Sequence, residues 1–347
     1  MLDREIRVAD RIIGGGHPCF VVAEIGSNHN RDLHMAKELI AAAVEAGADA
    51  VKFQSQALEE QYLAARETPE FIDFFRKTEL PEEWYADLWA EGTKRGTFVF
   101  SSPTYLRAVD LLEAQNVAVY KIASPQVATY PALVRRVAQT GKPMIVSAGM
   151  VTYPGLTRVV ETCLAEGNRA VVILHCVSRY PTAPADVNLR TMETYRAMFG
   201  GAVGFSDHTE GYHISVAATA LGAAVLEKHI TLDRRLPGPD HAFALEPSDF
   251  AAMVRAIRDA ESSLGSSARL SLPDDVQTFV RHIDMRLVAA RDIDAGEVLE
   301  PSLFVHRRTR EGISTSDLAR LANAVAARRI TAGSVVHWDD VVLSRSA

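Results

Sequence analysis

The stretch AVYKIASPQVATYPALVRRVAQTGKPMIVSAG (residues 118–149) predicts a β-strand, an α-helix and a second β-strand. The apolar runs at its two ends, 118–124 and 143–149, contain the β-branched residues that favour strands. Between them, Pro131 stands near the start and Gly141 just past the end of an amphipathic segment, as is common at the two ends of a helix. This order predicts two parallel strands joined by a helical crossover.

The same alternation of strand and helix extends over most of the chain. Six further apolar runs lie on either side of this unit: CFVVAEI (19–25), ADAVKF (48–53), FVFSS (98–102), AVVILHC (170–176), AVGFSDH (202–208) and AVLEKHI (224–230). Amphipathic stretches separate them, such as residues 33–46, with Asp32 as the expected N-cap and Gly47 as the stop. Eight such units predict an α/β protein whose parallel sheet closes into a (β/α)8 TIM barrel.

The composition changes after the barrel segment, for which we take residues 1–265. A serine-rich stretch with a proline, SSLGSSARLSLPDD (262–275), indicates a linker, which we place at 266–283. The remaining 284–347 contain short strand-like runs and predict a second, small mixed domain. About 64 residues bury only a small core, so we expect this domain to lean on the barrel or on another subunit.

Charge and cysteine usage exclude several classes of function. The 347 residues carry a net charge of −7, which argues against a nucleic-acid or membrane partner. No apolar run approaches the ~20 residues of a membrane span, and MLDREIRVADRI (1–12) lacks the apolar core of a signal peptide. The three cysteines, Cys19, Cys163 and Cys176, form no CxxC pair, as is typical of a reducing compartment. We therefore expect a cytoplasmic enzyme.

Polar residues end nearly every apolar run, at the end of the strands where barrels of this class place their active sites. They are Glu24, Lys52, Ser101, Ser102, Lys121, Ser147, His175, Ser206 to His208 and Glu227 to His229. Fraying of strand ends into solvent would account for two or three of them. A strand buried on both faces has no structural use for the rest, so we expect them to converge on one site. For His175 the sequence leaves a core role and a site role open.

Two lysines and three serines in or beside this set predict an anion pocket: Lys52, Lys121, Ser124, Ser147 and Ser206. An unpaired buried cation is costly, and a phosphate or carboxylate of a substrate would satisfy it. The alternative is that the lysines form internal salt bridges with Glu24 and Glu227, which would leave the serines unexplained.

Two histidines predict a metal site. In AVLEKHI the period of two puts Glu227 and His229 on one side of the strand and turns Lys228 away. His208 ends the preceding run, so two imidazoles from neighbouring strands would meet. Two nitrogens are too few for structural zinc, which takes four ligands, but they suit an exchangeable Mn²⁺, Mg²⁺ or Co²⁺ with open positions.

Nine motifs together resemble the sialic acid synthase (N-acetylneuraminate synthase-like) family, in the family's order: AEIGSNHN (23–30), VKFQ (51–54), SSPT (101–104), YKIAS (120–124), VSAGM (146–150), LHCVSRYPT (174–182), GFSDHT (204–209), LEKHIT (226–231) and PGPDHAFALEP (237–247). Those enzymes condense phosphoenolpyruvate with an N-acylated hexosamine to give a nine-carbon nonulosonic acid and phosphate. RLVAARDIDAGEVL and ITAGSVVHWDDV resemble the antifreeze-like (SAF, β-clip-like) domain that closes these proteins.

The resemblance implies a role for each matching residue. Phosphoenolpyruvate would be bound by Lys52, Ser102, Lys121, Ser124, Ser147 and Ser206, and the sugar by Gln54, Tyr180, Asp240 and Arg307. His208 and His229 would hold the metal, with Mn²⁺ expected before Mg²⁺ or Co²⁺. Glu24 would act as the acid/base near the reacting carbons, and Glu227 would anchor the site beside the metal. The SAF domain would cap the barrel of a second copy, which implies a domain-swapped homodimer.

Three departures from the family pattern fall on the acceptor side. Gln126 stands where many members carry glutamate, and Ser178 where N-acetylmannosamine synthases carry asparagine. The loop QALEEQYLAARETPEF (56–71) offers no asparagine at the matching place. We therefore expect N-acetylmannosamine to be a poor acceptor compared with a related sugar, such as a diacetamido sugar.

Two other functions remain as alternatives. Another phosphoenolpyruvate-dependent 3-deoxy-ulosonate synthase would need an extra basic cluster for the phosphate of its sugar. A sugar- or ice-binding protein would need no chemistry, but ice binding requires a flat, weakly charged face. The strongly charged HRRTRE (306–311) argues against ice binding.

Overall fold

The computed structural model describes residues 1–266, 268 and 271–343. Contacts divide the chain into two units, residues 1–265 and 266–347. In the part of the first unit that is described, the parallel strands are β3 (Phe20–Gly26), β4 (Ala50–Ser55), β5 (Phe98–Pro103), β6 (Tyr120–Ile122), β7 (Met144–Ser147), β8 (Val171–Cys176), β9 (Val203–Asp207) and β10 (Val225–His229). Their hydrogen-bonded order is β5-β4-β3-β10-β9-β8-β7-β6, and β5 contacts β6, so the sheet forms the expected (β/α)8 barrel.

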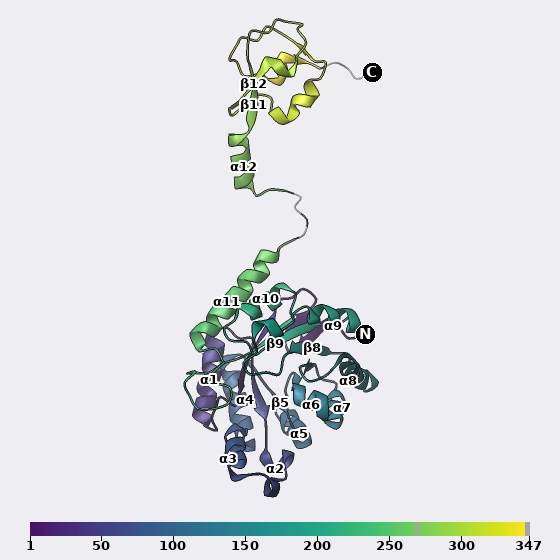
Figure 1. Ribbon diagram of the computed structural model, residues 1–347, viewed down its shortest axis with the longest axis vertical. Coiled ribbons are helices and arrows are strands. Elements are labelled where there is room, and N and C mark those ends of the chain that lie inside the picture. Colours follow the sequence, from purple (N-terminus) through teal and green to yellow (C-terminus); the bar gives the residue numbers. More distant parts are fainter. Residues whose placement is uncertain (267, 269–270, 344–347) are drawn as a thin grey trace. The chain divides into compact units, whose positions relative to one another are not determined.

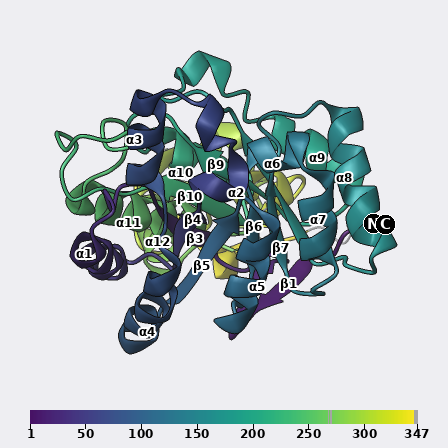
Figure 2. The same ribbon diagram turned by 90° about the horizontal axis from the view of Figure 1, so that it is seen from below.

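Helices accompany these strands, most of them on the outside of the barrel (Figure 1; Figure 2). They are α1 (Leu33–Glu45), α2 (Leu58–Gln61), α3 (Pro69–Thr78), α4 (Tyr85–Arg95), α5 (Leu106–Ala114), α6 (Ser124–Thr129), α7 (Pro131–Ala138), α8 (Tyr153–Ala165), α9 (Thr191–Phe199), α10 (His213–Ala220) and α11 (Pro247–Leu264). The predicted cap of α1 is confirmed, because the Asp32 carboxylate accepts hydrogen bonds from the backbone N–H groups of His34 and Met35.

Alternation along the strands divides the side chains into two sets. Val21, Ala23 and Ile25 of β3 pack outward against the helices, in a core cluster that includes residues of α1 and α11. Phe20 and Val22 point into the barrel, where they join residues such as Phe100 in a second cluster. Continuing in steps of two toward the carboxyl end of each strand, the inward-pointing residues become polar; on β3, for example, Glu24 follows Val22. The period of two therefore brings the site residues to the barrel mouth.

An N-terminal hairpin closes the other end of the barrel, and the sequence analysis did not predict it. Strands β1 (Glu5–Val8) and β2 (Arg11–Gly14) pair antiparallel, with Glu5 opposite Gly14. Ile6, Val8 and Ile13 are buried against the inner cluster of the barrel. Both strands have only four residues, and β1 has a charged residue at every second position, so the sequence signal is weak and the hairpin escapes prediction.

The second unit, described by itself, has a core of its own. It contains α12 (Asp274–Ile283), β11 (Met285–Ala289), β12 (Phe304–Arg308), β13 (Val325–Ala326) and β14 (Val341–Val342). Strands β11 and β12 pair antiparallel, and a small apolar cluster that includes Leu287, Phe304 and Val336 fills the unit. Helix α12 occupies the latter part of the predicted linker (266–283); residues 267, 269–270 and 344–347 lie outside the described part of the chain.

In the described residues, no helix combines the length and the apolar character that crossing a membrane requires.

Candidate active site

Two acidic and two basic side chains meet inside the mouth of the barrel. Lys52 on β4 lies 3.0 Å from the Glu24 carboxylate on β3 and 3.6 Å from that of Glu227 on β10. Lys121 on β6 lies 3.5 Å from Glu227. All four side chains are almost fully buried. The internal salt bridges that the sequence left as an alternative are thus present, and the two lysines and two carboxylates balance in formal charge.

The pKa values of the two carboxylates are shifted in opposite directions, upward for Glu24 and downward for Glu227. Burial, reinforced by Glu227, raises the pKa of Glu24 to about 7, although Lys52 and Gln54 act against it. Burial would also raise the pKa of Glu227, but Lys121 and Lys52 outweigh it and hold that pKa at about 2. Glu227 is therefore the fixed counterion of the lysines, whereas Glu24 can exchange a proton near neutral pH.

Two of the predicted serines contact the same charged groups. The Ser206 hydroxyl donates to Glu227 at 2.9 Å, and the Lys52 ammonium donates to Ser102 at 3.3 Å. Ser124, at the start of α6, accepts a hydrogen bond from the backbone N–H of Gly149 at 3.0 Å. In the described residues, the buried Ser147 hydroxyl has no hydrogen-bond partner. Since buried polar groups are normally paired, this hydroxyl is available to a polar ligand.

Two imidazoles lie beside this network. The rings of His208 and His229 have their centroids 5.5 Å apart. Nδ1 of His208 lies 2.9 Å from the carbonyl oxygen of Val177, a contact that orients the ring. Nδ1 of His229 is buried without a hydrogen-bond partner among the described side chains and backbone groups, and it lies 3.7 Å from the Asp240 carboxylate. Burial lowers the pKa of His229, which keeps its ring neutral and able to bind a metal.

The donor set therefore fits an open metal site rather than a closed one. Within the described ranges, no group of three or more His, Cys, Asp and Glu side chains is placed to hold a metal ion. Two imidazoles with an acidic oxygen nearby leave coordination positions for water or substrate, as an exchangeable catalytic ion requires.

The residues of the first unit that are expected to contact a sugar also lie at this mouth. Gln54 donates to Glu24 at 2.7 Å, and Asp240 accepts from the Ser27 hydroxyl at 3.2 Å. The Tyr180 ring is 4.2 Å from that of His208 and is half-exposed. Arg307 lies on β12 of the second unit, exposed, where its guanidinium donates to the carbonyl of His306.

Three titratable residues from the strand-end set point away from the mouth. His175 packs on the outside of β8 against Tyr195 of α9, with ring centroids 6.2 Å apart, so its role is in the core. Asp207 and Lys228 form a buried ion pair at 3.1 Å, also outside the barrel. The prediction that Lys228 turns away from Glu227 and His229 is confirmed.

Two residues of the site, Cys176 and Phe243, were not predicted from the sequence. The thiol of Cys176 lies 3.9 Å from Nδ1 of His208 and 3.8 Å from the Ser124 hydroxyl. The Phe243 ring is 5.0 Å from that of His229. Cys176 is two residues after Leu174 and four after Val172, which point into the barrel. This period of two could have predicted that Cys176 points inward as well. Phe243 follows the strands in an irregular segment, where periodicity gives no direction.

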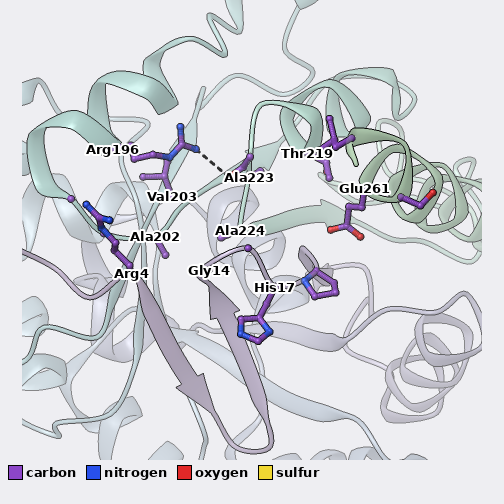
Figure 3. Close-up of a pocket in the computed structure, with 18 of the residues that line it drawn as sticks. Arg4, Gly14, His17, Arg196, Ala202, Val203, Thr219, Ala223, Ala224 and Glu261 are labelled. Atoms are coloured by element: carbon purple, nitrogen blue, oxygen red, sulfur yellow. Dashed lines mark hydrogen bonds between the residues drawn. The ribbon is translucent and has the colours of Figure 1, made fainter. Parts of the chain in front are cut away.

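A cavity of about 880 Å³ lies at the end of the barrel opposite to these residues (Figure 3). The hairpin end at Gly14, the first residues of β9 and the last turn of α11 line it. It contains none of the buried ion pairs or unpartnered polar atoms found at the mouth. We therefore place the candidate active site at the mouth, as barrels of this class require.

The barrel and its polar mouth define a (β/α)8 protein with its site at the carboxyl ends of the strands. Residues 39–269 match the NeuB family, and residues 285–342 match the SAF domain. An N,N'-diacetyllegionaminic acid synthase of Legionella pneumophila is 33% identical over 344 residues, which cover 94% of this chain and 96% of that protein. An N-acetylneuraminate-9-phosphate synthase of Homo sapiens is 39% identical over 300 residues, 83% of each protein.

A solved structure agrees with these relatives. The crystal structure of the N-acetylneuraminic acid (sialic acid) synthetase of Leptospira borgpetersenii, in complex with citrate, has a TM-score of 0.73 and 29% identity; the match covers 80% of this chain and 96% of that one. The chain belongs to the NeuB family and ends in a SAF domain. The resemblance from the nine motifs is confirmed, and the chain is an enzyme of a family whose members are synthases of sialic-type, nonulosonic acids.

Proposed function

We propose that the chain condenses phosphoenolpyruvate with an N-acyl hexosamine or a related diacetamido sugar, giving a nonulosonic acid and phosphate. The observation that carries this proposal is the pair of buried lysines, Lys52 and Lys121, beside the unpartnered hydroxyl of Ser147 and the two imidazoles. The lysines and the hydroxyl can bind an anionic donor, and the imidazoles can hold a cation that polarises the acceptor, so the reaction needs both sets of groups side by side.

Phosphoenolpyruvate would lie against the lysines and serines. Its phosphate would accept hydrogen bonds from the ammonium groups of Lys52 and Lys121 and from the hydroxyl groups of Ser124, Ser147 and Ser206, with Ser102 fixing the same molecule. These contacts exist throughout the reaction, so they contribute positioning more than selective stabilisation of the transition state.

His208 and His229 would hold a divalent cation, Mn²⁺ first among the candidates. Bound there, the cation would supply Lewis-acid polarisation of the acceptor's aldehyde oxygen. Gln54, Tyr180 and Asp240 would orient the open-chain sugar so that its aldehyde carbon faces carbon 3 of phosphoenolpyruvate. The new carbon–carbon bond joins these two atoms, and the aldehyde oxygen becomes a hydroxyl by taking up the proton that the attacking water gives up to Glu24 in the next step.

Glu24 would activate the water that completes the reaction. Bond formation leaves a cationic carbon 2, and a water molecule adds to it while the Glu24 carboxylate accepts a proton. The resulting tetrahedral carbon then breaks its bond to the phosphate oxygen, phosphate leaves, and the α-keto acid remains. A pKa of about 7 suits Glu24 to this role, because the carboxylate is both available and basic near neutral pH.

The proposal is tested by phosphate release. We expect the purified protein with Mn²⁺ to release phosphate from phosphoenolpyruvate only when an acceptor sugar is added. The panel contains N-acetylmannosamine and a 2,4-diacetamido-2,4,6-trideoxyhexose, together with erythrose 4-phosphate and arabinose 5-phosphate for the alternative synthases. Turnover confined to a sugar phosphate would favour the heptulosonate or octulosonate alternative, and no release with any sugar would favour a binding protein.

We also propose that the working unit is a domain-swapped homodimer in which Arg307 completes the partner's site. The exposed guanidinium on β12 has one hydrogen-bond partner in the described residues, the carbonyl of its neighbour His306. A planar guanidinium suits hydrogen bonding to the acyl carbonyl oxygen of a sugar.

Subunit exchange tests this arrangement. Arg307→Ala and His208→Ala, each inactive alone, are expected to recover activity when mixed, because the hybrid dimer has one site with both residues intact. About half of the hybrid's sites would then work. Arg308→Ala, the adjacent control, is expected to keep its own activity. A mixture that stays inactive after verified exchange, or an active monomer, would rule out the lid in trans.

A further inference from the structure

A cavity of about 330 Å³ extends from the candidate site toward the segment that follows β4. One wall is polar and belongs to the site, with Gln54, His229 and Asp240. Another part of the lining, called here the aromatic wall, comes from α3 and from Tyr62 in the connection between α2 and α3, helices that lie at one end of the barrel (Figure 1). A molecule whose reacting carbon lies near His229 can therefore reach this aromatic wall with its far end.

The aromatic wall is a preassembled cluster. The Tyr62 ring lies 5.1 Å from that of Phe71 and 5.0 Å from that of Phe75, which are distances of favourable aromatic pairing. Phe71, Phe74 and Phe75 share one face of α3, because they are spaced by three and four residues. Phe74 is 50% exposed, although it lines the cavity. The wall therefore offers apolar surface at which a ligand can displace water.

Charge around the cavity disfavours an anion. Asp240 contributes a carboxylate to the lining, and neither lysine nor arginine lines the cavity in the described part of the barrel unit. Arg76 on α3 pairs with Glu59 at 3.1 Å, and Arg31 nearby pairs with Glu79 at 3.3 Å. A phosphate ester at the far end of a sugar would meet aromatic rings and a carboxylate. Like charges brought together without a counterion are strongly disfavoured.

We propose that this cavity selects an unphosphorylated acceptor whose end remote from the aldehyde carries an apolar group, such as the methyl of a deoxy sugar or of an acetamido substituent. The selecting residues are Tyr62, Phe71, Phe74 and Phe75. This inference rests on the proposed function and deepens it.

The experiment compares kcat/KM for three acceptors at saturating phosphoenolpyruvate: a 2,4-diacetamido-2,4,6-trideoxyhexose, N-acetylmannosamine and N-acetylmannosamine 6-phosphate. We expect the trideoxy sugar to be preferred to N-acetylmannosamine by about tenfold or more. We expect the phosphate ester to be the poorest, at least about 100-fold below the trideoxy sugar.

Two variants at one exposed position assign the effect to the wall. Phe74→Ala is expected to raise KM for the trideoxy sugar about tenfold, with kcat and KM for phosphoenolpyruvate unchanged. Phe74→Lys places a cation in the wall. We expect it to reduce the ratio of kcat/KM for the trideoxy sugar to kcat/KM for the phosphate ester at least tenfold. The matched control, Leu63→Ala, removes an exposed apolar side chain of the same segment that does not line the cavity, and should behave as the wild type.

The outcomes separate this inference from the function on which it rests. Efficient turnover of the phosphate ester, or Phe74 variants with unchanged acceptor preference, would overturn the inference while leaving the synthase function intact. If Phe74→Lys leaves the preference between the trideoxy sugar and the phosphate ester unchanged, the wall is not the selecting element. No phosphate release with any of the three sugars would overturn both proposals.

Discussion

Replacing either His208 or His229 by alanine is expected to lower turnover by roughly 10²–10³-fold while leaving the fold intact. Two imidazoles are the only protein nitrogens that we assign to the cation, so loss of either leaves it held by one nitrogen and water. The acceptor's developing alkoxide then loses its electrostatic stabilisation. Turnover measurements, together with titration of Mn²⁺ into each variant, check both consequences.

Removal of the metal should reproduce the effect of these substitutions. A chelator is expected to inactivate the wild-type protein, and Mn²⁺, Co²⁺ or Mg²⁺ to restore turnover. His175→Ala is the matched control, because His175 is a buried histidine that packs against α9 outside the barrel. It should lower stability but keep Mn²⁺ binding. Full activity in exhaustive chelator would contradict the metal role.

Glu24→Gln is expected to lower kcat by roughly 10²–10⁴-fold, the usual contribution of a positioned general base. The substitution keeps the size of the side chain, and Lys52 retains Glu227 as a counterion at 3.6 Å. Binding of phosphoenolpyruvate should therefore change far less than kcat. Rapid-quench measurement of phosphate formation, alongside the dissociation constant for phosphoenolpyruvate, separates the two effects.

The pH dependence gives this prediction a sign. Burial raises the pKa of Glu24 to about 7, and the base must be deprotonated to accept a proton. Activity should therefore rise with pH through about 7, and Glu24→Gln should lack that rise. Glu261→Gln, a partly buried carboxylate at the opposite end of the barrel, should keep the wild-type profile. If the activity of Glu24→Gln still rises with pH through about 7, the rise belongs to the titration of another group.

The barrel was predictable because its signal is repeated. Each strand has an apolar run bounded by helix starts and stops, so an error at one boundary leaves the count of units unchanged. The inward direction of Lys52, Lys121, Glu227 and His229 was predictable for a related reason, because the period of two relates each polar residue to the apolar residues that precede it on its strand.

Pairing between strands that lie far apart in sequence was not predictable from periodicity. The sequence left open whether Lys52 and Lys121 bind an anion or their neighbours, and the structure shows the contacts with Glu24 and Glu227 that decide the ligand-free arrangement. The aromatic wall of α3 also escaped, because apolar residues at helical spacing normally indicate a buried face. Only the structure shows that Phe74 is exposed and lines a cavity.

The central claim is that this chain joins phosphoenolpyruvate to an amino sugar with cleavage of the carbon–oxygen bond. The most direct test is to run the reaction in ¹⁸O-labelled water and to analyse both products by mass spectrometry. The account predicts one phosphate per nonulosonic acid, with no ¹⁸O in the phosphate, because water attacks carbon 2 and the bridging oxygen leaves with phosphorus. Phosphate that carries ¹⁸O, or phosphate formed without the keto acid, would contradict it.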